Sequence, residues 1–249
     1  MNPKILLIDI ETSPNLAHVW GIWQQNVGLN QLLESSRTLC FSAKWLGEDD
    51  IVFSSSYKTT HKKMLQKIHK MMDEADAIIH YNGTKFDIPT LNKEFLLAGM
   101  PPPSPAKQID LLQVAKKQFR FVSNKLDYVS QALGLGKKTE HMGHELWVRC
   151  LNKDPQAWAL METYNVNDVI LLEKVYYKFR PWIKHHLNMS IFSEDGIVCP
   201  NCGSNHYQKR GFALTSVSKF QRMQCCDCGN WFRGNKNLRT VKEKVVNVI

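Results

Sequence analysis

The sequence predicts an α/β protein in which a mixed sheet is flanked by helices and followed by a small cysteine-rich module. Strand-like apolar runs dominate the first 55 residues, strand and helix patterns then alternate to about residue 112, and helical patterns follow. Five of the seven cysteines lie between residues 199 and 228. A length of 249 residues accommodates one good-sized domain and one small module. We therefore expect domains at residues 1–193 and 194–249.

The expected strands are apolar runs bounded by turn-forming residues. Residues 4–12 form such a run and end in acids, and residues 38–46 alternate apolar and polar side chains. Shorter runs at 51–55 and 77–81 predict two further strands. Residues 108–112 fit either a last short strand or the start of a helix.

The expected helices show apolar side chains at helical spacing. Residues 61–74 have this pattern, and 86–97 form a second helix that tolerates Pro89 in its first turn. Further helical patterns lie at 125–133, 144–151 and 155–179. The segment 13–37, with Trp20 and Trp23, is too apolar for a free linker, so we expect it to pack over one face of the domain.

The composition is that of a water-soluble globular protein, with 43% hydrophobic and 22% charged residues. No apolar run approaches the length of a membrane span, and the N-terminus lacks the pattern of a signal peptide. We therefore expect a cytoplasmic protein with no membrane partner, in a bacterium or in a virus-infected cell.

The positive charge is concentrated at the C-terminus. Residues 199–249 contain nine Lys/Arg against two acids, and this net charge of +7 is most of the chain's +9. Such a segment favours a polyanionic partner, nucleic acid above all. The alternative is a solvated basic tail.

Two carboxylates stand together at the end of the first strand. Asp9 and Glu11 are two residues apart, so their side chains point to the same side of the strand. They repel each other, and burial disfavours both charged forms, so a divalent cation is the usual compensation. The alternative is a strand that ends in solvated acids.

Three later residues can complete an acidic site. Asp87 follows the strand at 77–81, and the alternative role for it is to stabilise a helix N-terminus. Tyr164 and Asp168 are four residues apart on one apolar helix face, where an unpaired carboxylate is costly. The alternative for Asp168 is a solvated helix flank or a bond to a nearby Lys. Four carboxylates suit Mg²⁺ or Mn²⁺, and a tyrosine one turn away can orient or deprotonate water.

The order and wording of these motifs carry a resemblance. Asp9-Ile10-Glu11-Thr12, then Asn-Gly-Thr-Lys-Phe-Asp at 82–87, then Tyr164 with Asp168, resembles the three motifs of the DEDD superfamily of 3′–5′ exonucleases. The tyrosine places the resemblance in the DEDDy branch, and the chain is similar to the proofreading domain of family B DNA polymerases over roughly residues 3–180.

The resemblance implies a ribonuclease H-like fold and two catalytic Mg²⁺ or Mn²⁺ ions. By this likeness Asp9, Glu11 and Asp168 bind one ion, Asp9 also serves the second, Asp87 holds the second through water, and Tyr164 positions the nucleophilic water. Asn82 and Phe86 would line the substrate groove. Asp110 is either a supporting acid or a helix-start acid. No polymerase domain follows in this sequence, so we expect substrate positioning to come from elsewhere.

The C-terminal cysteines predict a zinc ribbon. Cys199 and Cys202 form one Cys-x-x-Cys-Gly turn, Cys225 and Cys228 form another, and 22 residues lie between Cys202 and Cys225. This spacing suits one structural Zn²⁺, with Cys226 either surplus or a ligand in place of Cys225.

Aromatic and cationic side chains interleave within the ribbon, a pattern that suits binding of single-stranded nucleic acid. The alternative is that the rings form the module's own small core. The predicted substrate-binding cations are Lys209, Arg210, Arg222 and Arg233.

The expected function is a metal-dependent 3′–5′ exonuclease that acts on nucleic acid by a two-metal mechanism. Single-stranded DNA is the favoured substrate over RNA, and a replication or repair protein is the kind of protein partner expected. The alternatives are a structure-specific endonuclease on the same fold and a nucleic-acid-binding or recruitment protein with a lapsed site.

Overall fold

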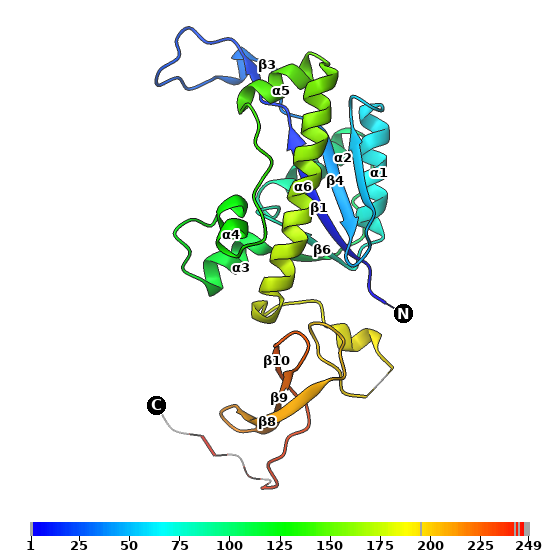
Figure 1. Cartoon of the computed structure of the whole chain (residues 1–249), viewed down its shortest axis with the longest axis vertical. Coiled ribbons are helices and arrows are strands. Elements are labelled where there is room, and N and C mark those ends of the chain that lie inside the picture. The colour runs from blue at the N-terminus through cyan, green and yellow to red at the C-terminus, as the bar shows by residue number, and fades with distance from the viewer. Residues whose placement is uncertain (1, 195, 242, 244, 247–249) are drawn as a thin grey trace. The chain divides into compact units, whose positions relative to one another are not determined.

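The computed structural model describes residues 2–194, 196–241, 243 and 245–246. They fall into two compact units, one of Lys4–Tyr176 and one made mainly of residues from Tyr177 onward (Figure 1). The domain boundary expected between residues 193 and 194 stays a prediction. Lys242 and Lys244, which contribute to the C-terminal charge, lie outside the described residues.

A five-stranded sheet forms the centre of the first unit. Its order is β5-β4-β1-β6-β7, with β4 antiparallel to β1 and β5, and β6 parallel to β1 and β7. The strands expected at 38–46, 51–55 and 77–81 are confirmed. The bounds are β1 Ile5–Thr12, β4 Thr38–Trp45, β5 Ile51–Ser55, β6 Ala77–His80 and β7 Lys107–Asp110.

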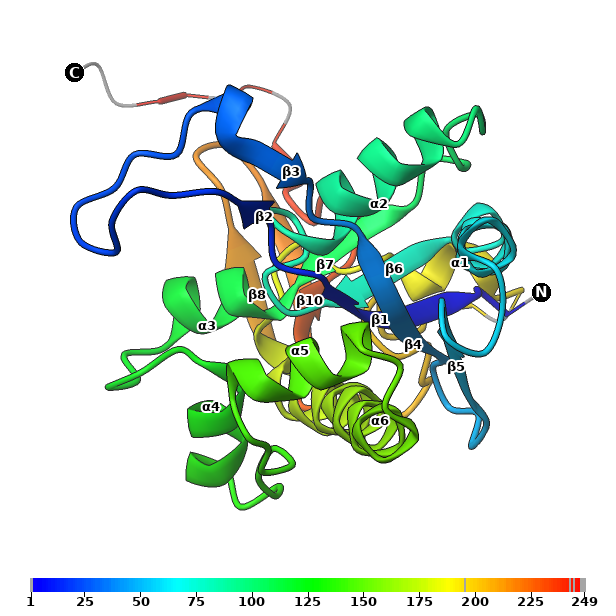
Figure 2. The same ribbon diagram turned by 90° about the horizontal axis from the view of Figure 1, so that it is seen from above.

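Two helices cover one face of this sheet, α1 (His61–Asp73) and α2 (Asp87–Leu97) (Figure 2). The side chains of Leu6, Ile8 and Ile10 on β1 belong to one buried cluster with residues of both helices. Because successive strand side chains alternate between faces, the remaining residues of β1 point to the other side of the sheet.

The opposite face carries α5 (His144–Leu151) and α6 (Pro155–Phe179). Leu39 of β4 packs there with Leu146 of α5 and with Trp158 and Met161 of α6. Since Asp9 and Glu11 alternate with the core residues of β1, they project toward the side on which α6 lies.

In the sequence between α2 and α5 lie two further helices, α3 (Leu111–Gln118) and α4 (Leu126–Ala132). The two readings of residues 108–112 are both realised, because β7 ends at Asp110 and α3 begins at the next residue. None of the helices in the described part of the chain is both long enough and apolar enough to cross a membrane.

The expectation that residues 13–37 pack over the domain is wrong. They form an arm with two very short paired strands, β2 (Leu16–Ala17) and β3 (Leu32–Glu34), and the short 3₁₀ helix η1 (Leu29–Gln31). Trp20 is 100% exposed and Trp23 81% exposed. The apolar composition suggested burial, but both indole rings of the arm lie at the surface.

The second unit contains a three-stranded antiparallel sheet of order β10-β9-β8. Its strands are β8 (Tyr207–Leu214), β9 (Lys219–Cys225) and β10 (Trp231–Arg233), preceded by two 3₁₀ helices, η2 (Arg180–Trp182) and η3 (Met189–Phe192). The mixed sheet flanked by helices and the small cysteine-rich sheet both agree with the predicted fold class.

Candidate active site and cysteine cluster

Three carboxylates converge at the end of β1. Asp9 and Glu11 come from the strand itself and Asp168 from α6, and one oxygen of each lies within 4.8 Å of the others. The register pairs Asp9 with Ser42 and Glu11 with Cys40 on β4, so the strand that carries both acids is held on its antiparallel side. Two elements far apart in the sequence therefore build one acidic centre.

The positive charge at this centre comes from Lys138, in the loop before α5. Its ammonium group donates to Asp168 Oδ2 at 2.5 Å and to the Tyr164 hydroxyl at 3.2 Å. Its backbone N–H donates to Asp127 Oδ1 of α4 at 2.9 Å, which fixes the loop from the other end. Lys138 therefore neutralises part of the acidic charge and holds the tyrosine.

Asn165 connects α6 to β1 directly. Its side-chain amide donates to Asp9 Oδ2 at 2.6 Å and to the Asp9 carbonyl at 3.3 Å, and it is fully buried. Because the amide bonds both the backbone and the carboxylate of Asp9, it sets the distance between the helix and the strand.

Asp87 lies beside this centre but outside the group of three. It is the first residue of α2, is 98% buried, and accepts a hydrogen bond from the Ile10 N–H at 3.2 Å. Asp110 caps the N-terminus of α3 and also accepts from the Asn82 N–H at 3.0 Å. Of the two roles considered for Asp110, the structure shows the helix-start acid.

Burial and mutual repulsion raise the carboxyl pKa values. Burial, followed by the charge of Asp168, raises the pKa of Asp9 well above its ordinary value and that of Glu11 to about 8. Burial also raises the pKa of Asp87 to about 7, opposed by the Ile10 N–H. Burial lowers the pKa of Lys138, but Asp168 and Tyr164 outweigh it, so the pKa lies above its ordinary value.

The donor set fits a hard divalent cation. Three carboxylate oxygens within reach of one another, with raised pKa values, are a site whose charged form needs a cation. Mg²⁺ and Mn²⁺ prefer such oxygen ligands. The ammonium group of Lys138 also places a positive charge beside Asp168.

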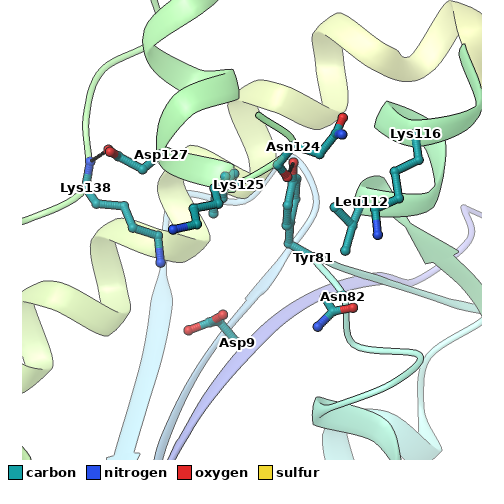
Figure 3. A pocket seen from close by; sticks show the side chains of 10 residues that line it. Asp9, Tyr81, Asn82, Leu112, Lys116, Asn124, Lys125, Asp127 and Lys138 are labelled. Carbon is teal, nitrogen blue, oxygen red and sulfur yellow. Dashed lines mark hydrogen bonds between the residues drawn. The ribbon is translucent and has the colours of Figure 1, made fainter. Parts of the chain in front are cut away.

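A cleft of about 580 Å³ opens beside Asp9. In Figure 3, Lys138 reaches toward Asp9, and Tyr81 reaches toward Asn124, whose backbone carbonyl accepts its hydroxyl at 2.7 Å. The cleft is also lined by Lys116, Lys125 and Asp127, so its walls combine three cations, two carboxylates, amides and one aromatic ring. That chemistry fits a phosphate-bearing chain.

The predicted groove residues lie in different positions. Asn82 lines the cleft and adopts a left-handed conformation with φ of 71°, which asparagine tolerates better than most residues. Phe86, just before α2, is 42% exposed and does not line the cleft. Contact of either residue with substrate stays a prediction.

The sequence analysis missed Lys138 and Asn165. Asn165 follows Tyr164 directly, so the helical position next to a motif residue was a usable signal. Lys138 lies in a Gly-rich break and carries no local pattern. The ring of His141 also lies edge-on against that of Tyr164, with ring centroids 4.8 Å apart.

The second unit gathers four thiols. The sulfurs of Cys199, Cys202, Cys225 and Cys228 lie within 4.8 Å of one another, and two of the distances are 3.6 Å. A tetrahedral Zn²⁺ with bonds of about 2.3 Å would space its thiolates roughly 3.8 Å apart. Cys226 is exposed and outside the group. The donor set thus fits one zinc ion held by the two Cys-x-x-Cys turns.

The ribbon pairs cations with rings. The guanidinium of Arg222 lies over Trp231 at 5.2 Å, and that of Arg233 lies over Phe220 at 3.9 Å. Strand pairing sets Arg233 opposite Arg222, so these two cations share one face of the sheet. Lys209 and Arg210 are exposed on β8.

The comparisons with known proteins agree with this fold. A family model of the RNase H superfamily matches residues 6–180, well over half of the chain. The chain belongs to the RNase H superfamily. No curated protein matches it. Membership supports a nuclease-type function and confirms the ribonuclease H-like fold that the sequence resemblance implied.

One solved structure has a similar fold. This chain is similar to the family B DNA polymerase from the hyperthermophilic archaeon Pyrobaculum calidifontis, with 15% identity and a TM-score of 0.56. The similarity covers 72% of this chain and 25% of the polymerase, so the chain spans only a quarter of that protein's length. At this identity the likeness concerns the fold alone.

Lys138→Met is expected to destabilise the RNase H-like unit in the absence of added Mg²⁺ or Mn²⁺, by about 2 kcal/mol, because Asp168 loses its ion-pair partner. Added Mn²⁺ should restore much of the melting temperature, Tm. Lys137→Met is the matched control, since the Lys137 side chain is exposed and its ammonium group donates to the exposed Glu140. Equal Tm values for both variants without the cation would contradict the role of Lys138.

The pH dependence of stability should report the buried carboxyl groups. The folded-state pKa of Glu11, about 8, exceeds its ordinary 4.5, so the folded protein binds more protons than the unfolded chain and stability falls as pH rises between these values. Glu11→Gln removes this titration. Without added divalent cation, its Tm relative to wild type should therefore increase from about pH 5 to about pH 8.5. A constant Tm difference across this range would contradict the raised pKa.

Proposed function

We propose that the chain is a metal-dependent 3′–5′ exonuclease that removes nucleotides from single-stranded DNA. The observation that carries the proposal is the convergence of Asp9, Glu11 and Asp168 beside a cleft lined by lysines. The three motifs occur in the order of the DEDDy exonucleases, with Tyr164 one helical turn before Asp168.

The acidic residues would hold the cations. Asp9, Glu11 and Asp168 suit one divalent ion. By the resemblance to the DEDDy exonucleases, Asp9 and Asp87 would serve the second ion. When bound, two such ions supply an activated water and stabilise the charge on the attacking and leaving oxygens of a phosphodiester. Hydrolysis adds water across the terminal linkage and releases a nucleoside 5′-monophosphate, leaving a new 3′ hydroxyl.

Other side chains would place the strand and the water. Lys116 and Lys125 lie where phosphates of an entering strand can be neutralised. The Tyr164 hydroxyl accepts a hydrogen bond from Lys138 and would orient the attacking water. In the ribbon, Arg222 and Arg233, together with the exposed side of Trp231, would bind the strand.

Asp9→Asn should lower degradation of a 5′-labelled single strand by at least about 100-fold with Mg²⁺ or Mn²⁺, because a cation ligand contributes several kcal/mol to the barrier. Asp49→Asn, in an exposed turn, is the matched control. The products should form a ladder that shortens from the 3′ end, and a 3′-blocked strand should resist.

Two further substrates separate the alternatives. Cleavage of a circular single strand would favour an endonuclease on the same fold, and tight binding with no degradation of any strand would favour a lapsed site. An RNA strand of the same sequence, run in parallel, reports whether a 2′ hydroxyl is accepted.

The cysteine cluster is proposed to bind one structural Zn²⁺. Metal analysis of the purified chain should find about one zinc per protein. Cys225→Ser should lose the zinc and unfold the ribbon, whereas Cys226→Ser, at the exposed neighbouring position, should retain it. The opposite result would assign the ligand to Cys226, and absence of zinc from the wild-type protein would overturn the site.

A further inference from the structure

Residues 13–37, which we call the tryptophan arm, expose several large apolar side chains to solvent. Leu29 is 90% exposed, Ile22 is 82% exposed and Trp20 is wholly exposed. Figure 1 shows the arm, in blue beyond β3, extending away from the five-stranded sheet. Apolar groups concentrated on one projecting segment mark a surface that is covered in use.

The arm is a built element. The Ser13 N–H donates to the Arg37 carbonyl at 2.8 Å and closes its base. Further out, the Gln31 side chain accepts from the Gly28 N–H at 2.8 Å and donates to the His18 carbonyl at 3.0 Å. These bonds frame a cavity of about 420 Å³ lined by His18, Val19, Trp20, Asn30 and Gln31. That volume lies within the usual range for a small-ligand pocket.

The chemistry of the arm indicates what covers it. Residues 20–31 contain two tryptophans and five amides but no charged side chain; the amides are Gln24, Gln25, Asn26, Asn30 and Gln31. Indole rings stack on bases, and amide groups hydrogen-bond to base edges. Phosphates need cations, and residues 20–31 contain none, whereas the cleft is lined by three lysines. An apolar protein groove would not call for so many amides beside the rings.

The arm lies close enough to the acidic centre to contact the same nucleic-acid strand. It leaves β1 directly after Glu11 and Thr12, and Trp20 is nine residues beyond Glu11, so an extended chain limits their separation to about 30 Å. One strand of B-form DNA rises about 3.4 Å along the helix axis for each phosphate. A base held at Trp20 would thus lie within about nine nucleotides of the 3′ end.

We propose that the tryptophan arm binds unpaired bases of the substrate strand through Trp20 and Trp23. The inference rests on the proposed nuclease function and deepens it, since it names bases rather than phosphates as what the arm recognises. Both rings are exposed, so neither substitution removes a core contact.

Binding of a labelled single-stranded oligothymidine tests this by fluorescence anisotropy, in an Asp9→Asn background so that the strand stays intact. Trp20→Ala and Trp23→Ala should each weaken binding about tenfold, the loss of one base stack, and Trp20→Phe should retain most of it. Leu97→Ala on α2, a residue 77% exposed and apolar, is the matched control.

A strand with abasic residues two to nine nucleotides from its 3′ end isolates the contact. It should bind the parent protein about 100-fold more weakly than the intact strand, because both base stacks are lost, and Trp20→Ala should add no further loss. Unchanged binding by both Trp→Ala variants, or additive losses with the abasic strand, would overturn the arm's role alone. Failure of the parent protein to bind any strand would instead remove the nuclease proposal on which the inference rests.

Discussion

The cost of holding three carboxylates together at the end of one buried strand shapes the RNase H-like unit. Burial raises the pKa of all three, and the charge of Asp168 raises the pKa values of Asp9 and Glu11 further. Lys138 supplies one positive charge and Asn165 supplies two donors to Asp9. The acidic centre is stable because the groups that bond to its carboxylates are held in place by the sheet, by α6 and by the loop before α5.

The sheet order explains how those segments meet. β1 is the central strand, so strands on both sides hold its acids in place. The parallel strands β6 and β7 end on the same side of the sheet, where the Asn82 N–H donates to Asp110. That bond anchors the turn into α2, and the first residue of α2, Asp87, bonds back to β1 at Ile10. The position of Asp87 therefore depends on a chain of contacts that crosses three strands.

Much of this was predictable from the sequence, because alternation and helical spacing are local properties. The strands, the long helices and the cysteine turns follow from such patterns, and motif order pointed to the acids. Lys138 was not predictable, since its role depends on a loop meeting α6 thirty residues later in the chain. The arm was mispredicted because apolar composition indicates burial only where a surface is available to cover it.

The protonation of the acidic centre has a consequence for how a cation enters it. Burial raises the pKa values of Glu11 and Asp87 toward or above neutral, so a divalent ion that binds these carboxylates would displace protons into the solvent. Apparent affinity for such an ion would then rise with pH, and acidification would release the ion as the carboxylates take up protons.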